Sequence, residues 1–154
     1  MQISEILTAN SVKTLVSTTS KKRLFQQLGE QAELAYGFDA AAVVEALLDR
    51  ESLGPTGVGH GIALPHARIE GADRVCGLFV RLEKPLDFDS VDRQPVDLVF
   101  ALFAPESAGV EHLKALALVS RTMRDASICA KLRANTDIAT LHTILTEAQA
   151  SQAA

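Results

Sequence analysis

The sequence predicts an α+β fold in which a central mixed β-sheet is flanked by helices on both faces. Two segments with apolar side chains at helical spacing come first, in residues 20–36 and 39–53. Strand-forming segments follow, and Val96–Phe103 is a continuous apolar run, which is typical of a strand buried on both faces. Helical spacing returns from residue 109 onward. Helices before and after the strands favour a sheet that is covered on both faces.

The length and composition indicate one domain. The chain has 154 residues, of which 47% are apolar and 22% are charged, and these values suit a single globular core. We assign the domain to residues 1–148 and expect a flexible C-terminal tail at residues 149–154. We see no signal peptide and no apolar run near 18 residues, so we expect a cytoplasmic protein without membrane insertion.

Charge and cysteine content narrow the function classes. The net charge is −4, and the chain has no tryptophan and one tyrosine, so neither a basic stripe nor a stacking platform favours nucleic-acid binding. Cys76 and Cys129 are far apart and suit two buried free thiols in a reducing compartment.

The first two long helices have recognisable ends. Ser20 and Asp39 are predicted N-caps, Gly37 ends the first helix, and Gly54-Pro55 prevents the second from continuing. Their predicted buried faces are Leu24, Phe25, Leu28, Ala32 and Ala35, then Val43, Val44, Leu47 and Leu48. Residues 3–19 leave two alternatives open, a short helix around Ile3–Leu7 or a short edge strand in residues 11–18.

The middle of the chain predicts three strands. A glycine-rich loop in residues 54–66 leads into a short strand at Gly61–Leu64. The second strand is Val75–Leu82, and a turn-rich connection joins it to the third, Val96–Phe103.

Three helices are predicted after the strands. They are Gly109–Arg124, Ser127–Ala134 and Asp137–Ala148. The first is expected to bury Leu113, Leu116, Ala117, Ser120 and Met123, and the last Ile138, Leu141, Leu145 and Ala148.

The four histidines, His60, His66, His112 and His142, are the candidates for chemistry. The sequence lacks the G-x-S-x-G nucleophile elbow, the Lys-Ser/Thr end of a phosphate-binding loop, and the zinc motif H-E-x-x-H. We therefore expect neither a metal nor a cofactor. His142 lies beside the core stripe of the last helix and is interpreted as structural or solvated.

His66 stands on a segment that the sequence makes both stiff and open. Pro65 fixes its own backbone and favours an extended Leu64. Glycines at 57, 59 and 61 leave one face of the backbone without side chains, so another group can approach it closely. His66 is therefore either a carrier of a charged group or a histidine that only ends a strand.

Arg50 and His112 are open to two interpretations as well. Arg50 is either a cation that suits a helix C-terminus or a guanidinium that pairs with phosphate oxygens. His112 lies in the first turn of a helix, where it either supports a bound anion or is a partly exposed surface residue. The basic run Lys21–Arg23 is either a solvated face or a surface that steers an acidic partner.

Two segments carry a family resemblance. The chain resembles the bacterial phosphotransferase-system enzyme IIA family of the mannitol/fructose type in the segments DRESLGPTGVGHGIALPHARIE and PVDLVFALFAPESAGVEHLKALALVSRTMRD. The likeness is especially close to the nitrogen-regulatory branch and covers about residues 1–148.

The resemblance implies a phosphohistidine carrier. His66 would accept a phosphoryl group, with Nε2 as the expected atom, from a small histidine phosphocarrier protein. Arg50 and His112 would support the phosphoryl group, with further support from Thr56, Gly59 and Gly61. No metal or cofactor is implied.

Three functions remain open from the sequence. The first is a carrier of the nitrogen-type chain that acts on regulatory target proteins through its phosphorylation state. The second is a sugar-specific enzyme IIA that passes phosphate to a permease IIB domain. The third is a binding module that keeps the fold without transferring phosphate.

Overall fold

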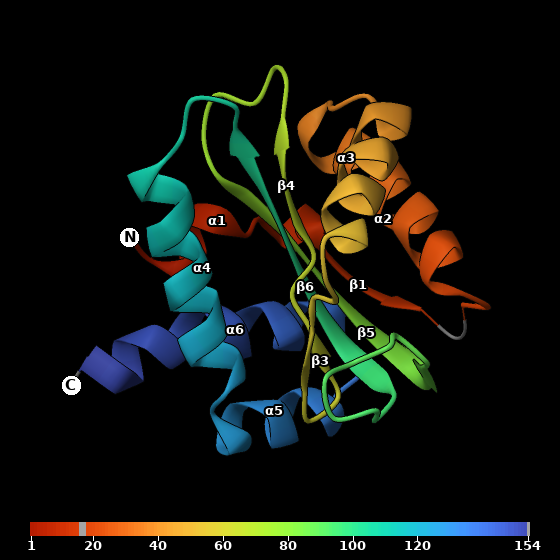
Figure 1. Ribbon diagram of the computed structural model, residues 1–154. Helices are drawn as coiled ribbons and strands as arrows, with labels where there is room; N and C mark the ends of the chain where they lie inside the picture. Colours follow the sequence, from red (N-terminus) through yellow and green to blue (C-terminus); the bar gives the residue numbers. More distant parts are fainter. Residues whose placement is uncertain (16–17, 154) are drawn as a thin grey trace.

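One mixed sheet with helices on both faces forms the molecule, as the sequence predicts (Figure 1). The structure is a computed structural model that describes residues 1–15 and 18–153, with side chains to residue 147. The helices are α1 (Ile3–Ile6), a 3-10 turn η1 (Ala9–Ser11), α2 (Lys21–Tyr36), α3 (Ala40–Ser52), α4 (Val110–Met123), α5 (Ala126–Arg133) and α6 (Ile138–Ala153). The strands are β1 (Val12–Leu15), β2 (Gly57–Gly59), β3 (Ile62–Ala63), β4 (His66–Ile69), β5 (Cys76–Leu86) and β6 (Val96–Pro105).

β6 organises the sheet. It pairs antiparallel with β5 along one edge, and β5 pairs in parallel with β1. Along its other edge β6 pairs in parallel with β3 and then with β4, where His66 lies opposite Leu102. β2 pairs antiparallel with β3 at the far edge. The start of β4 is therefore fixed against the most deeply buried strand.

Each face of the sheet has its own apolar core. The face covered by α2 and α3 buries Phe25, Leu28, Val43, Leu47 and Phe103 among others. The opposite face is covered by α1, α4, α5 and α6, and buries Ile3, Phe79, Phe100, Leu118 and Leu145 among others. Each such side chain contributes about 1.5–3 kcal/mol through burial.

The helix ends predicted for α2 and α3 are confirmed. The Ser20 hydroxyl accepts the Arg23 N–H at 3.0 Å, and the Asp39 carboxylate accepts the Ala42 N–H at 3.0 Å. Gly37 adopts a left-handed backbone with φ of 75°, which glycine reaches without steric cost. Near the N-terminus both alternatives hold, because α1 forms a short helix and β1 an edge strand. The end of that predicted strand, residues 16–17, lies outside the described residues.

The glycine-rich segment differs from its prediction. Instead of a loop and one strand, it forms β2, β3 and β4, so His66 begins a strand. Glycine and proline signal turns in the sequence. β3 and β4 pair with β6, far away along the chain, and β2 pairs with β3. β5 also runs beyond its predicted end, to Leu86.

The predicted buried face of α4 is wrong. Apart from Met123, the side chains that α4 buries are His112, Ala115, Leu118, Val119 and Thr122, whereas Leu113 is 68% exposed. Apolar residues surround much of this helix, so their spacing does not define one face. Leu113 therefore does not contribute to the core of this face.

The C-terminal helices and both cysteines complete the fold. α5 begins after an Asp125 cap, and α6 continues through Ala153, so it includes most of the segment predicted as a tail. Residue 154, and side chains after residue 147, lie outside the described residues. Cys76 and Cys129 are buried free thiols, as predicted. No described helix has the length and apolar character needed to cross a membrane.

Candidate functional site

The imidazole of His66 is held in one tautomer by the backbone before it. Its Nδ1 lies 2.9 Å from the carbonyl oxygen of Leu64. A carbonyl oxygen only accepts hydrogen bonds, so Nδ1 carries the proton and Nε2 keeps a free lone pair. The stiff Leu64–Pro65 step thus sets which ring nitrogen carries the proton and which keeps its lone pair.

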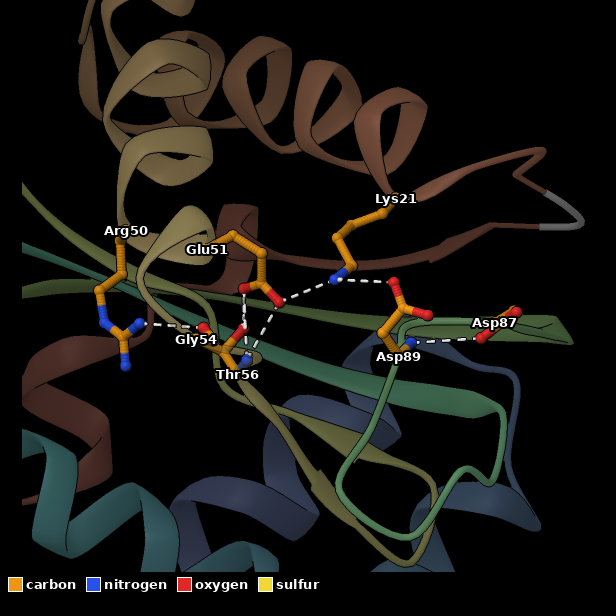
Figure 2. Close-up of polar contacts among 7 residues, drawn as sticks. All are labelled: Lys21, Arg50, Glu51, Gly54, Thr56, Asp87 and Asp89. Atoms are coloured by element: carbon orange, nitrogen blue, oxygen red, sulfur yellow. Dashed lines mark hydrogen bonds and ion pairs between the residues drawn. The ribbon is translucent and has the colours of Figure 1, made fainter.

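Arg50 lies directly against the unprotonated Nε2 of His66. Its Nε–H donates to Nε2 of His66 at 3.2 Å, and its Nη1 donates to the carbonyl oxygen of Gly54 at 3.1 Å, a bond drawn in Figure 2. Arg50 belongs to the last turn of α3, where a cation also suits the helix dipole. The two interpretations of Arg50 are therefore compatible, and the residue lies within reach of any group bound to Nε2.

His112 reaches the same place from α4. Its ring centroid lies 5.6 Å from that of His66, with the ring planes at 72°. The residue is 7% exposed, so of the two interpretations the partly exposed surface residue is excluded. Its Nε2 is buried and has no hydrogen-bond partner among the described residues. An unpaired buried ring nitrogen is costly, and a bound polar group would satisfy it.

These three side chains line one cavity of about 540 Å³. It lies between the C-terminal end of α3, the start of β4 and the start of α4. Leu53 and Leu113 also line it, and they are 83% and 68% exposed. Polar groups at the centre and exposed leucines at the edge form a site that is open to a protein partner. The remaining lining residues are Ala46, Asp49, Ala67, Arg68 and Leu116.

The site keeps both imidazoles neutral near pH 7. Burial lowers the pKa of His66 below 6.5, and the nearby Arg50 cation lowers it further, against the opposing effects of the Leu64 carbonyl and Glu51. Burial also lowers the pKa of His112, with smaller contributions in the same direction from His66 and Arg68. A neutral imidazole is the form that attacks an electrophile.

The residues expected to add phosphate support lie elsewhere. Thr56 is 3% exposed and donates both its N–H and its hydroxyl to Glu51. A side chain at Gly59 would meet Asp92, and one at Gly61 would meet Arg133 and Asp97. None of the three lines the cavity around His66. Their glycine and threonine character serves the β2–β3 hairpin and its neighbours.

The sequence reasoning did not assign a function to Glu51 or to the two rim leucines. Glu51 follows Arg50 directly, and its carboxylate binds Thr56 and Lys21 (Figure 2). Lys21 thus takes part in an internal ion pair, in addition to marking a basic helix start. The sequence feature that could have pointed to Glu51 is its position directly after Arg50. The feature that could have pointed to Leu113 is that α4 has more apolar residues than one buried face can hold.

Comparison with known proteins confirms the family resemblance. Residues 5–148 match the family model "Phosphoenolpyruvate-dependent sugar phosphotransferase system, EIIA 2". The chain is 44% identical over 145 residues to a nitrogen regulatory protein of Bradyrhizobium diazoefficiens, covering 94% of this chain and 95% of that protein.

Solved structures agree with this assignment. The crystal structure of nitrogen regulatory protein IIA-Ntr from Neisseria meningitidis superposes with a TM-score of 0.87 at 38% identity, covering 94% of this chain and 99% of that one. The mannitol IIA protein of Escherichia coli superposes with a TM-score of 0.74 at 25% identity, covering 90% and 98%. The chain therefore belongs to the EIIA 2 family of the phosphoenolpyruvate-dependent sugar phosphotransferase system.

Proposed function

We propose that the protein is a phosphohistidine carrier of the nitrogen-type phosphotransferase chain, and that Nε2 of His66 carries the phosphoryl group. This proposal rests mainly on the two hydrogen bonds made by the imidazole ring of His66. Nδ1 is occupied by the Leu64 carbonyl, while Nε2 faces Arg50 in an open cavity.

The transfer is a displacement at phosphorus. The donor is a phosphohistidine on a small histidine phosphocarrier protein. The Nε2 lone pair of His66 forms a new N–P bond as the N–P bond of the donor breaks, and the electron pair of that bond returns to the donor nitrogen. Nδ1–H stays bonded to the Leu64 carbonyl, which stabilises the positive charge that develops on the ring.

Arg50 and His112 compensate the charge of the transferred group. The Arg50 guanidinium releases Nε2 when the donor arrives and turns its N–H groups to the phosphoryl oxygens, whose geometry matches its fork. The unpaired Nε2 of His112 supplies one more hydrogen bond in its protonated tautomer. Such a transfer depends on positioning and charge stabilisation, so these groups suffice without a metal or cofactor.

Regulation follows from where the charge appears. Phosphorylation adds about 1.5–2 negative charges at the centre of a surface edged by exposed leucines. A target that packs on Leu53 and Leu113 meets a neutral imidazole in one state and a dianion in the other. We therefore propose that regulatory target proteins in the cytoplasm distinguish the two states.

Sequence similarity favours the regulatory role over a sugar-specific one. Identity is 44% over 94% of this chain and 38% over 94% to two nitrogen regulatory proteins, 36% over 78% to a fructose-specific EIIABC component, and 25% over 90% to mannitol IIA. The same site would also serve transfer to a permease IIB domain, because the chemistry at His66 is unchanged.

Incubation with phosphoenolpyruvate, the first enzyme of the system and the small carrier tests the proposal. Intact mass should show one added, acid-labile phosphoryl group on the wild type and none on His66→Ala. No label on the wild type would favour a binding module that no longer transfers phosphate. Onward transfer to a purified IIB domain would favour the sugar-specific role.

A further inference from the structure

Glu51 is a buried carboxylate whose polar contacts all converge on one turn and one lysine. Its side chain is 7% exposed. It accepts the Thr56 N–H at 3.0 Å, the Thr56 hydroxyl at 2.5 Å, and a hydrogen bond from Lys21 Nζ at 2.9 Å (Figure 2). A buried carboxylate persists only when it is paired and hydrogen-bonded in this way. Glu51 therefore fixes the position of Thr56 relative to the end of α3.

Thr56 passes this constraint to the nucleophile. Its carbonyl oxygen accepts the Leu64 N–H at 2.9 Å. The carbonyl oxygen of the same Leu64 accepts Nδ1–H of His66 at 2.9 Å. Two hydrogen bonds, which pass through Thr56 and Leu64, thus connect the Glu51 carboxylate with the bond that sets the tautomer of His66.

The same turn holds the guanidinium. Gly54, two residues before Thr56, accepts Nη1–H of Arg50 at 3.1 Å (Figure 2). The turn of residues 54–56 therefore anchors both Arg50 and, through Leu64, His66. Displacement of this turn would move the two groups that must meet on the phosphoryl group.

Lys21 completes the arrangement from another helix. It begins α2, lies 3.8 Å from an Asp89 carboxylate oxygen, and stands 4.6 Å from the centre of the Phe88 ring. These contacts fix the lysine against Glu51 and balance its charge. Glu51 itself does not line the cavity around His66, so it does not touch the transferred group.

We infer that Glu51 is a positioning residue for phosphoryl transfer, which acts through Thr56 to hold both Arg50 and the Nδ1–H tautomer of His66. The inference rests on the proposed function of His66. A small misplacement of reacting groups costs about 100-fold in rate, so the expected effect is kinetic, not a loss of the acceptor itself.

The test compares Glu51→Gln with wild type and with Glu45→Gln, an exposed glutamate on the same helix. We expect Glu51→Gln to reach full labelling at His66 but to slow single-turnover transfer by about 10- to 100-fold. In the same variant, ¹⁵N shifts of the His66 ring should show loss of the pure Nδ1–H tautomer. Glu45→Gln should match wild type in both measurements.

Two milder variants keep the test decisive if Glu51→Gln unfolds. Thr56→Val removes the buried hydroxyl and keeps the N–H, whereas Thr56→Ser restores the hydroxyl. We expect slower transfer and a mixed tautomer in Thr56→Val, with recovery of both in Thr56→Ser.

The inference is overturned if folded Glu51→Gln or Thr56→Val transfers at the wild-type rate with the wild-type tautomer. It is also overturned if slower labelling only follows the unfolded fraction measured by circular dichroism. Failure of wild-type protein to accept a phosphoryl group would instead contradict the proposed function, so the two failures are distinguishable.

Discussion

The imidazole rings of His66 and His112 meet edge to face, with their centroids 5.6 Å apart. The two histidines come from β4 and α4, which are more than 40 residues apart along the chain. Two cations at this distance would repel each other, and burial disfavours each charge separately. Both rings are therefore expected to be neutral near pH 7, which suits the phosphoryl carrier that we propose.

Titration of the His66 and His112 rings should show directly that their pKa values are lowered. We predict that His66 and His112 both titrate below pH 6.5 in the unphosphorylated protein, because burial lowers both pKa values. In His66→Ala the pKa of His112 should rise, since its burial is reduced and the His66 ring, which disfavours a charge on His112, is removed. ¹H–¹⁵N spectra of the ring nitrogens measure both. A midpoint at or above 6.5 for wild-type His66 would contradict the account.

The same pKa values predict how stability depends on pH. A histidine whose folded pKa is lowered binds fewer protons folded than unfolded, so its contribution to stability is full above pH 6.5 and falls as pH drops through the folded pKa. We expect urea unfolding to show a smaller pH dependence between 7.5 and 5 in His66→Gln/His112→Gln than in wild type. Equal slopes would contradict the lowered values.

Arg50→Ala should slow phosphoryl transfer without unfolding the chain. The guanidinium lies at a half-buried helix end and contacts His66 and Gly54, so its loss removes charge compensation more than core packing. Removal of one such group typically costs about 100- to 1,000-fold in rate. Single-turnover labelling and circular dichroism measure the two effects, with exposed Arg121→Ala as the control. Collapse of the spectrum would mean that Arg50 is structural.

His112→Ala should retain labelling at His66 but exchange the phosphoryl group more slowly, by about 10- to 100-fold. Its buried, unpartnered Nε2 is the donor that the variant removes. His142→Ala on α6 is the histidine control, since it does not line the cavity. A fully normal rate in His112→Ala would remove this residue from the site.

Leu53→Asp and Leu113→Asp should weaken docking of the carrier protein while leaving stability within about 0.5 kcal/mol. Both leucines are mostly exposed and line the cavity, so we expect their apolar surface to contact a partner and to add little to the core. Titration calorimetry with the carrier measures affinity. Leu34→Asp is the matched control, because Leu34 is 80% exposed on α2 and does not line the cavity. Equal affinity in all three variants would contradict this role.

Local signals predicted most of the fold. The caps Ser20 and Asp39, the left-handed Gly37 and the continuous apolar β6 each depend on near neighbours in the sequence. β4 was missed because its ladder partner, β6, lies far away along the chain. β2 was missed because its glycines signal a turn, although they form a short local hairpin with β3. The prediction of the buried face of α4 was wrong because Leu113 is apolar like a core residue, whereas its side chain is exposed.

The sequence proposes three main site residues and does not single out Glu51. His66, Arg50 and His112 come together in one cavity. Their convergence depends on three separate elements, so residue spacing alone left each of them ambiguous. Glu51 was missed because the positioning role that we infer for it depends on backbone hydrogen bonds of Thr56 and Leu64, which no side-chain pattern reveals.

The position of the phosphoryl group on the ring is the most direct test of the account. Protein labelled with ¹⁵N at histidine and phosphorylated through the carrier can be examined by ¹⁵N–³¹P coupling. The structure predicts phosphorus bonded to Nε2 of His66, with Nδ1 still facing the Leu64 carbonyl. Phosphorus on Nδ1 of His66, or on His112, would contradict it.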